Sequence, residues 1–385
     1  MDHSDAQSRF AIRGNLAIEG RLHLGAVVIA GERIAEVLLD PRDGNLPETV
    51  VDAEFVAPGF IDLQVNGGFG VEVDANPEHL RALSARLPET GVTAWLPTVI
   101  SSPPELYPGV LAAYGAGSDH PGAVALGFHL EGPYLSAKRA GAHPIEAIEN
   151  APDSLLSMFL NSHSVRLVSL APERPGGIDR IRRLRQAGIV VSLGHTDASY
   201  EDFVKGIGAG ATMATHLYSA MSGLHHRVPG AVGAALLDGR VVAGMIVDGV
   251  HAHRAAVGIA FRMKGPTGIA LVTDMVSAAG MPTGTYHLGG RAVESDGIAV
   301  RLPDGTLAGS ALTMDQAIRN LVNWKIASPA ESIQMATETP AAVLGLDDRG
   351  RLITGAYADL VLLDEALRVT RTIVQGATRY DRSPR

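Results

Sequence analysis

The stretch FIDLQVNGG, Phe60 to Gly68, alternates apolar and polar residues and then ends in two glycines. The alternation predicts a β-strand that runs into a tight turn, because successive side chains of a strand point to opposite faces. Asp62, Gln64 and Asn66 then share one face. Amides bind substrates and orient water, but they are poor ligands for transition metals. The function of this polar face therefore depends on what the rest of the chain supplies.

Seven more strand-like runs follow this stretch, and helical stretches such as residues 77–87 and 178–186 lie between them. The eight runs span residues 60–65, 93–99, 123–130, 165–170, 189–193, 211–217, 241–247 and 269–273. Eight strands with helical crossovers are the pattern of an α/β protein of the (β/α)₈, TIM-like barrel type. A doubly wound open sheet is the competing interpretation, but no Gly-x-Gly-x-x-Gly turn follows the first strand.

Both ends of the chain carry further strand-like runs, separated by Gly, Pro and Asp turns. We expect these runs to pair into one small β-sandwich domain, built from residues 1–56 and 346–385. The catalytic barrel would then occupy residues 57–345 as an insertion between the two pieces.

The composition of the 385-residue chain excludes several classes of protein. A formal net charge of −9 argues against a nucleic-acid surface. No apolar run approaches the length of a membrane span, and the polar N-terminus lacks a signal-peptide profile, so we expect a cytoplasmic protein without a membrane contact. The absence of cysteine excludes disulfides and sulfur ligands. Any metal must therefore use His, carboxylate or carbonyl ligands.

Polar residues stand at the ends of most predicted strands, where a barrel of this type places its active site. Glu131 ends the third strand, His195 follows the fifth and His216 ends the sixth. Each alone has an ordinary structural explanation, but together they would bury a carboxylate and two imidazoles, which is costly without a shared partner. A divalent cation is such a partner, because two His and one carboxylate with an open position form a catalytic zinc site.

Asp274 ends the eighth strand beside this predicted metal site. A carboxylate next to the metal, but outside its ligand set, can take a proton from water and return it to a leaving group. The ordinary alternative is that Asp274 caps the following segment.

Two loops with basic residues follow strands three and six, and they would suit an anionic group such as a phosphate. For Lys138 and Arg139 in the first loop, we favour a solvated surface position. Arg227 is better placed for recognition, because it lies in a long loop bounded by Gly and Pro.

The motifs around these residues resemble those of N-acetylglucosamine-6-phosphate deacetylases of the amidohydrolase superfamily. They run in order from about residue 50 to 365: APGFIDLQVNGG, HLEGPYLSAKRAGAHP, LGHTDAS, ATHLYSAMSGLHHRVPG, VDGVHAH, LVTDMVSAAG, LAGSALTMDQA and ATETPAAVLGLDDRGRLITGAYADLVLLD. The resemblance implies a metal-dependent hydrolase that converts N-acetylglucosamine 6-phosphate to glucosamine 6-phosphate and acetate, in amino-sugar catabolism or cell-wall recycling.

The resemblance also implies functions for individual residues. Glu131, His195 and His216 match the ligands of one divalent cation per subunit, with Zn²⁺ as the first expectation and Fe²⁺, Mn²⁺ or Co²⁺ as alternatives. Asp274 matches the proton carrier, and His143 matches a residue that helps to polarise the acetyl carbonyl. The remaining matched substrate contacts are Ala142, Ser219, Ala220, His251, Leu307, Ala308 and Gly309.

Arg227 matches a phosphate ligand that reaches into the neighbouring subunit's site, which implies a homodimer. The chain departs from the family's usual pattern at Ser219, where Asn is usual, at Tyr218, where Phe is common, and at Gly223, where Pro is usual. The shorter Ser219 leaves an alternative substrate open, such as the galactosamine epimer or another N-acyl compound.

The strand-one amides indicate the number of metals. Dinuclear relatives place two histidines where this chain has Gln64 and Asn66, so the amides predict a single metal and leave Gln64 free to position the water or the substrate. Strand four also lacks the lysine that other dinuclear members of the superfamily carboxylate. A catalytically inactive barrel kept as a binding module would lack a ligand or the base, whereas all four residues are present here.

Overall fold

The computed structural model describes residues 9–41, 46–116 and 121–382. Eight parallel strands form a nearly closed barrel, as predicted, and they are hydrogen bonded in chain order. The strands are β5 (Phe60–Val65), β8 (Val92–Ile100), β10 (Phe128–Glu131), β11 (Val165–Leu170), β12 (Val190–Leu193), β13 (Met213–Ala214), β14 (Val242–Met245) and β15 (Ile269–Leu271), with the short β9 (Val124–Ala125) beside β8.

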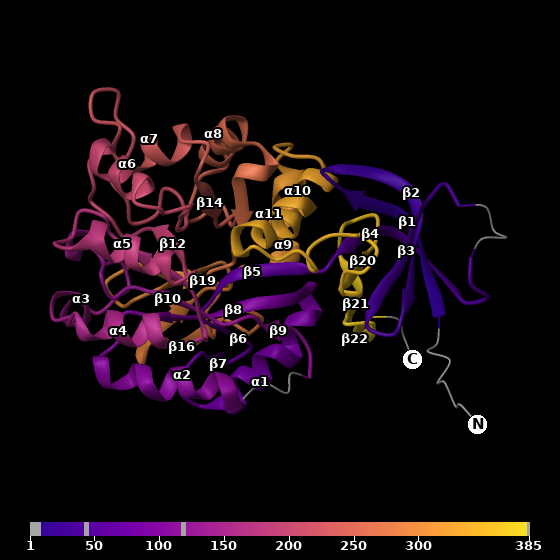
Figure 1. Cartoon of the computed structure of the whole chain (residues 1–385), viewed down its shortest axis with the longest axis horizontal. Coiled ribbons are helices and arrows are strands. Elements are labelled where there is room, and N and C mark those ends of the chain that lie inside the picture. Colours follow the sequence, from indigo (N-terminus) through magenta and orange to yellow (C-terminus); the bar gives the residue numbers. More distant parts are fainter. Residues whose placement is uncertain (1–8, 42–45, 117–120, 383–385) are drawn as a thin grey trace.

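Helices cover the outside of the barrel (Figure 1). They are α1 (Pro77–Arg86), α2 (Tyr107–Ala116), α3 (Ile145–Glu149), α4 (Ser154–Asn161), α5 (Gly177–Gln186), α6 (Tyr200–Gly208), α7 (Gly230–Leu237), α8 (Arg254–Lys264), α9 (Met314–Asn323), α10 (Pro329–Ala336) and α11 (Glu338–Leu344), with 3₁₀ turns at Leu87–Thr90, Pro104–Leu106, Ala137–Arg139 and Pro266–Gly268. Several begin at side-chain caps: Ser328 and Glu331 form a capping box at α10, and Ser199 accepts the Asp202 N–H at α6.

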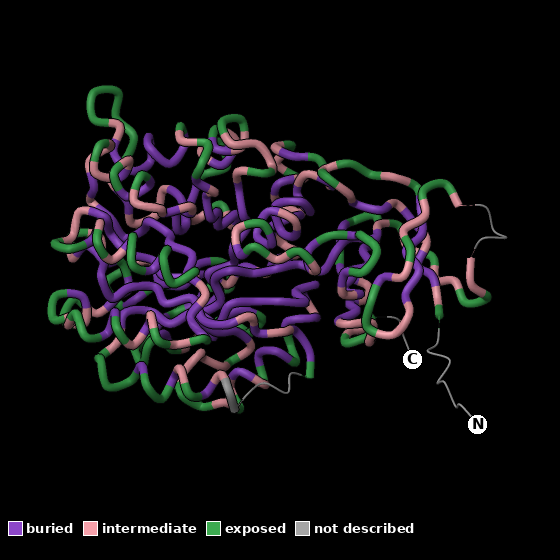
Figure 2. The backbone as a smooth tube through the Cα atoms, viewed as in Figure 1, coloured by how far each residue is buried: buried purple, intermediate pink, exposed green. Residues whose placement is uncertain are grey.

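The barrel strands are buried on both faces, whereas helices on the outside, such as α1 and α5, mix buried and exposed residues (Figure 2). This burial explains why the strands read as continuous apolar runs in the sequence. None of the helices among the described residues has the length and apolar character that a membrane span requires.

The two ends of the chain meet in a second sheet, as the sequence predicted (Figure 1). Its seven strands follow the order β22 (Ala377–Asp381), β21 (Val369–Val374), β20 (Leu360–Leu363), β4 (Val50–Pro58), β1 (Arg9–Ile18), β2 (Arg21–Ala30) and β3 (Arg33–Leu39). Side chains from both ends, such as Ile29 and Leu362, pack into one core cluster, so the sheet encloses a core of its own. β4 continues through Gly59 into β5, so the domain boundary after residue 56 remains a prediction.

No strand was predicted between residues 284 and 306, where the structure has most of an antiparallel sheet. This sheet consists of β16 (Gly284–Leu288), β17 (Arg291–Ser295), β18 (Ala299–Arg301) and β19 (Leu307–Ser310). It packs against Ile100 and Ala142 at the mouth of the barrel. A short hairpin of two strands with two residues each, β6 (Gly67–Gly68) and β7 (Val71–Glu72), follows β5 at the mouth of the barrel.

Candidate active site

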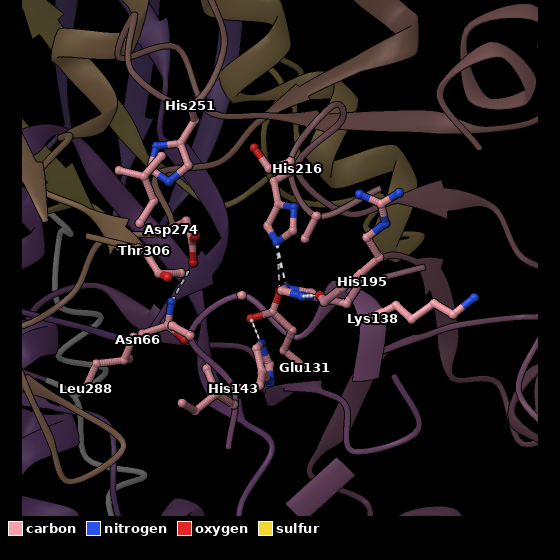
Figure 3. A pocket seen from close by; sticks show the side chains of 18 residues that line it. Asn66, Glu131, Lys138, His143, His195, His216, His251, Asp274, Leu288 and Thr306 are labelled. Atoms are coloured by element: carbon pink, nitrogen blue, oxygen red, sulfur yellow. Dashed lines mark hydrogen bonds and ion pairs between the residues drawn. The ribbon is translucent and has the colours of Figure 1, made fainter. Parts of the chain in front are cut away.

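A cavity of about 420 Å³ opens at the carboxyl ends of the barrel strands. Figure 3 shows Glu131, His195, His216 and His143 gathered on one side of it, with Asp274 facing them. The cavity is also lined by predicted substrate-contact residues, namely Ala142, Ser219, Ala220, His251, Leu307 and Gly309. The barrel geometry therefore brings together residues that are up to 243 positions apart in the sequence, counting from position 66 to position 309.

Glu131, His195 and His216 form a compact, buried set of donor atoms at the base of the cavity. One donor atom from each lies within 4.8 Å of the others. His216 Nε2 is 3.0 Å and His195 Nε2 is 3.3 Å from Glu131 Oε1, and the two Nε2 atoms are 3.2 Å apart. No other group of three metal-binding side chains of this kind occurs in the described part of the chain.

The protonation of His195 tests whether this set suits a cation. His195 Nδ1 lies 2.7 Å from the Arg139 carbonyl oxygen, so Nδ1 carries a proton and donates it. In the neutral ring, Nε2 is then an unprotonated donor atom that faces His216 Nε2 and the Glu131 carboxylate. Three electron-pair donors that converge in this way fit a divalent cation, and the Arg139 carbonyl fixes the tautomer as outer partners of metal ligands do.

The electrostatics of Glu131 keep it ionised. Burial raises the pKa of this carboxyl, but its close contacts with the imidazoles of His143, His195 and His216 outweigh burial and hold the pKa well below its usual range. Burial lowers the pKa of His216, while the hydrogen bond and charge of Glu131 raise it to about 9. The carboxylate therefore supplies the negative charge that balances a cation at this position.

His143 is a neutral hydrogen-bond donor at the cavity wall. Its Nδ1 accepts the backbone N–H of Ser101 at 3.1 Å and lies 2.9 Å from the Ser101 hydroxyl. Nε2 therefore carries the proton, and it lies 3.5 Å from Glu131 Oε2. Burial, followed by the charge of His195, lowers the pKa of His143 to about 4. The side chain can thus donate a hydrogen bond to a substrate oxygen without being charged.

Asp274 is held by the strand-one amides. Its Oδ1 accepts Asn66 Nδ2 at 2.7 Å and Gln64 Nε2 at 3.0 Å. Gln64 Nε2 also donates to Glu131 Oε1 at 3.0 Å, so one amide group bridges the two carboxylates. This differs from the expectation that Gln64 is free, and Gln64 is not among the residues that line the cavity; its contact with the water or the substrate remains a prediction. Burial, followed by the charge of Glu131, raises the pKa of Asp274 to about 6.

His251 is anchored by a partner that was not predicted from the sequence, and Asn66 carries an unpaired oxygen. His251 donates from Nδ1 to Asp248 Oδ2 at 2.6 Å, and Asp248 Oδ1 accepts the backbone N–H groups of Val250 and His251, both at 2.8 Å. His251 Nε2 is thereby left to interact with a ligand. Asn66 Oδ1 is buried and has no hydrogen-bond partner within the described residues, which leaves an acceptor at the cavity wall.

Some predicted residues lie outside the cavity lining. Arg227 is exposed in the loop between β13 and α7, and Ala308 is buried in β19 next to two residues that do line the cavity. Lys138 and Arg139, expected on a solvated surface, line the cavity rim and pair with Asp197. The lining residues Leu288 and Thr306 were missed, because no signal in the sequence revealed the β16–β19 sheet.

Comparisons with known proteins agree with this geometry. A family model described as the amidohydrolase family matches residues 55–379. The chain is 40% identical to an N-acetylgalactosamine-6-phosphate deacetylase of Escherichia coli O157:H7, over 84% of this chain and 88% of the relative. It is 37% identical to an N-acetylglucosamine-6-phosphate deacetylase of Lysinibacillus sphaericus, over 90% and 91% of the two chains.

The fold is also close to that of solved structures. A mutant N-acetyl-D-glucosamine-6-phosphate deacetylase of Mycobacterium smegmatis, in complex with N-acetyl-D-glucosamine-6-phosphate, superimposes with a TM-score of 0.90. The two chains are 32% identical, and the match covers 97% of this chain and 99% of that one.

Proposed function

This chain belongs to the amidohydrolase family, and we propose that it hydrolyses the N-acetyl group of N-acetylglucosamine 6-phosphate to glucosamine 6-phosphate and acetate. One observation carries this proposal. A buried Glu131–His195–His216 donor set, with His143 beside it, faces Asp274 in a single cavity, and the chain matches such deacetylases over most of its length. Two carboxylates in one site then have different tasks, one as a ligand and one as a proton carrier.

Glu131, His195 and His216 would hold one divalent cation, for which we propose zinc. Such a cation supplies Lewis acidity that polarises the acetyl carbonyl and lowers the pKa of a nearby water. His143 Nε2–H donates to the carbonyl oxygen as negative charge develops there.

Asp274 moves the proton in this mechanism. With its pKa at about 6, the carboxyl is mostly ionised at neutral pH and can accept a proton from the attacking water. The same group then gives that proton to the leaving amine nitrogen when the C–N bond breaks. Gln64 and Asn66 fix its orientation through the hydrogen bonds to Oδ1.

We further propose a homodimer in which Arg227 binds the phosphate of a substrate in the partner's site. The exposed position of Arg227, away from its own cavity, supports this arrangement. Leu224 and Val228 beside it are 58% and 63% exposed, and exposed apolar side chains of this kind suit a surface that a second subunit covers. Because a sugar phosphate does not cross membranes unaided, we place the enzyme in the cytoplasm.

The galactosamine epimer is the second candidate substrate. An N-acetylgalactosamine-6-phosphate deacetylase is 40% identical to this chain, and Ser219 lies at the cavity wall where the family that the chain resembles usually has Asn. The two epimers differ only in the orientation of one hydroxyl, so a single contact in the cavity can decide between them.

Acetate release from both N-acetylhexosamines, each with and without the 6-phosphate, tests the proposal on protein of measured metal content. We expect the highest kcat/KM with N-acetylglucosamine 6-phosphate and a large loss without the phosphate. A higher kcat/KM with the galactosamine epimer would replace the first candidate by the second. No acetate from either phosphorylated sugar would refute both. If Ser219 distinguishes the two epimers, Ser219→Asn should raise the ratio of kcat/KM for N-acetylglucosamine 6-phosphate to kcat/KM for the galactosamine epimer, relative to the unchanged chain.

A further inference from the structure

Asp62 is a buried carboxylate that the proposed mechanism does not use. Its side chain is fully buried and accepts three hydrogen bonds: Thr273 Oγ1 donates to Oδ2 at 2.6 Å, and the N–H groups of Thr273 and Gln64 each donate to Oδ1 at 3.2 Å. No basic side chain of the described residues is paired with it. Burial raises the pKa of Asp62 to about 7. A carboxylate is costly to place here, so its presence calls for a specific reason.

The hydrogen bonds of Asp62 cross the seam where the barrel closes. β5 and β15 are the two ends of the barrel sheet, and these described strands share no ladder. Two and four residues beyond Asp62, backbone hydrogen bonds close the seam, from Asp274 N to Gln64 O at 2.9 Å and from Asn66 N to Met275 O at 2.9 Å. At the level of Asp62 itself, the side-chain bonds to Thr273 take the place of a ladder.

The segment that Asp62 holds leads directly into the proton carrier. Asp274 has a φ of 51°, in the left-handed region that a residue with a side chain rarely adopts. Such a conformation is strained and persists only when its surroundings fix it. Thr273 is fixed from two sides, by Asp62 and by the Ser310 hydroxyl, which donates to the Thr273 carbonyl oxygen at 2.6 Å.

The polar side chains of β5 and of the residue after it thus all contact residues 273 and 274. Gln64 and Asn66 bind the side chain of Asp274, while Asp62 binds the residue before it. We propose that Asp62 is a positioning residue for Asp274, because it clamps Thr273 across the barrel seam and so fixes the backbone from which the Asp274 carboxylate enters the cavity. The consequence for catalysis rests on the proposed function, whereas the clamp itself does not.

Two variants remove the clamp to different extents. Asp62→Ala deletes all three hydrogen bonds, and Thr273→Val removes only the hydroxyl while it keeps the shape of the side chain. Both are expected to lower kcat, by about 10- to 100-fold for Asp62→Ala, the range found when outer partners of a site are removed. KM and the affinity for Zn²⁺, measured by competition with a chelator, should stay nearly unchanged. The double variant should lower kcat by less than the product of the two single effects, because both changes remove the same hydrogen bond from Thr273 Oγ1 to Asp62.

Hydrogen exchange gives a readout that needs no substrate. Peptides that cover residues 272–276 should exchange faster in both variants than in the unchanged chain, while a peptide over β11 should not change. Asp359→Asn is the matched control, since Asp359 is a buried carboxylate of the terminal sheet that pairs with Arg349. This control should lower the melting temperature without changing kcat or exchange at the seam.

The outcomes separate the clamp from the proposed function. A lack of acetate release by the unchanged, metal-loaded chain refutes the function, and the exchange experiment still tests the clamp. If hydrogen exchange of residues 272–276 is unchanged in both variants, Asp62 does not clamp Thr273. In an active enzyme, an unchanged kcat in the variants, or a rise in KM alone, also overturns the proposal. If Asp62→Ala does not fold, Thr273→Val decides by the same measurements.

Discussion

Replacement of Asp274 by asparagine removes the proton carrier and little else. Asp274 Oδ1 accepts hydrogen bonds from Gln64 and Asn66, and the Oδ1 of an asparagine accepts the same two bonds. Asp274 also lies outside the Glu131–His195–His216 donor set, so metal content should remain as in the unchanged chain. The loss is therefore confined to proton transfer.

The magnitude follows from the two proton transfers that Asp274 serves. General acid–base catalysis contributes about 10²–10⁴-fold, and since one carboxyl acts in both steps we expect the upper part of that range. A fall in kcat of about 10³–10⁴-fold corresponds to about 4–5.5 kcal/mol in the activation free energy.

Acetate release under saturating N-acetylglucosamine 6-phosphate measures this loss, with metal content determined on the same sample. Asp359→Asn serves as the control for loss of a buried carboxylate elsewhere in the fold. A variant at position 274 that retains its metal and turns over within about threefold of the unchanged chain, a difference of less than 1 kcal/mol, would show that Asp274 is not the proton carrier.

Three more outcomes are expected. Below about pH 6, kcat/KM should fall tenfold per pH unit, because the base must be ionised and burial raises the pKa of Asp274 to about 6; a flat profile between pH 5 and 7 would contradict this. Gln64→Glu replaces the amide that donates to Glu131 and Asp274 with a third carboxyl group, whose negative charge should raise the pKa of Asp274. The fall of kcat/KM at low pH should therefore begin at a higher pH. An unchanged pH profile would show that Gln64 does not affect the pKa of Asp274. Arg227→Ala should raise KM for the phosphorylated sugar with kcat nearly unchanged, and equal cleavage of the sugar with and without phosphate by the unchanged chain would remove this residue's proposed task.

Much of the barrel could be predicted because its strands are buried on both faces. β5, β8 and β11 read as apolar runs in the sequence, and their observed bounds lie within one residue of those predicted. The metal-binding set was predictable for a related reason. In a parallel barrel, the carboxyl ends of all strands meet at one rim, so Glu131, His195 and His216 had to converge once the strands were placed.

The sheet from β16 to β19 could not be predicted in the same way. Its strands have only three to five residues each and alternate with turns, so their apolar residues give no sustained period. Leu288 and Thr306 line the cavity but could therefore not be predicted as lining residues.

The hydrogen-bond partners of the site residues also could not be predicted from the sequence. The strand alternation put Asp62, Gln64 and Asn66 on one face, but only the closure of β5 against the end of β15 reveals that all three face residues 273 and 274. The tautomer of His195 likewise depends on a backbone carbonyl, that of Arg139, which no side-chain pattern encodes.

Titration of the metal-stripped protein with Zn²⁺ tests the central claim most directly, with acetate release from N-acetylglucosamine 6-phosphate followed at each addition. We predict no measurable acetate release without metal. Acetate release should then rise linearly with added Zn²⁺ and saturate at one zinc per chain, held by Glu131, His195 and His216. Full activity of the stripped protein, or saturation only at two metals per chain, would contradict this prediction.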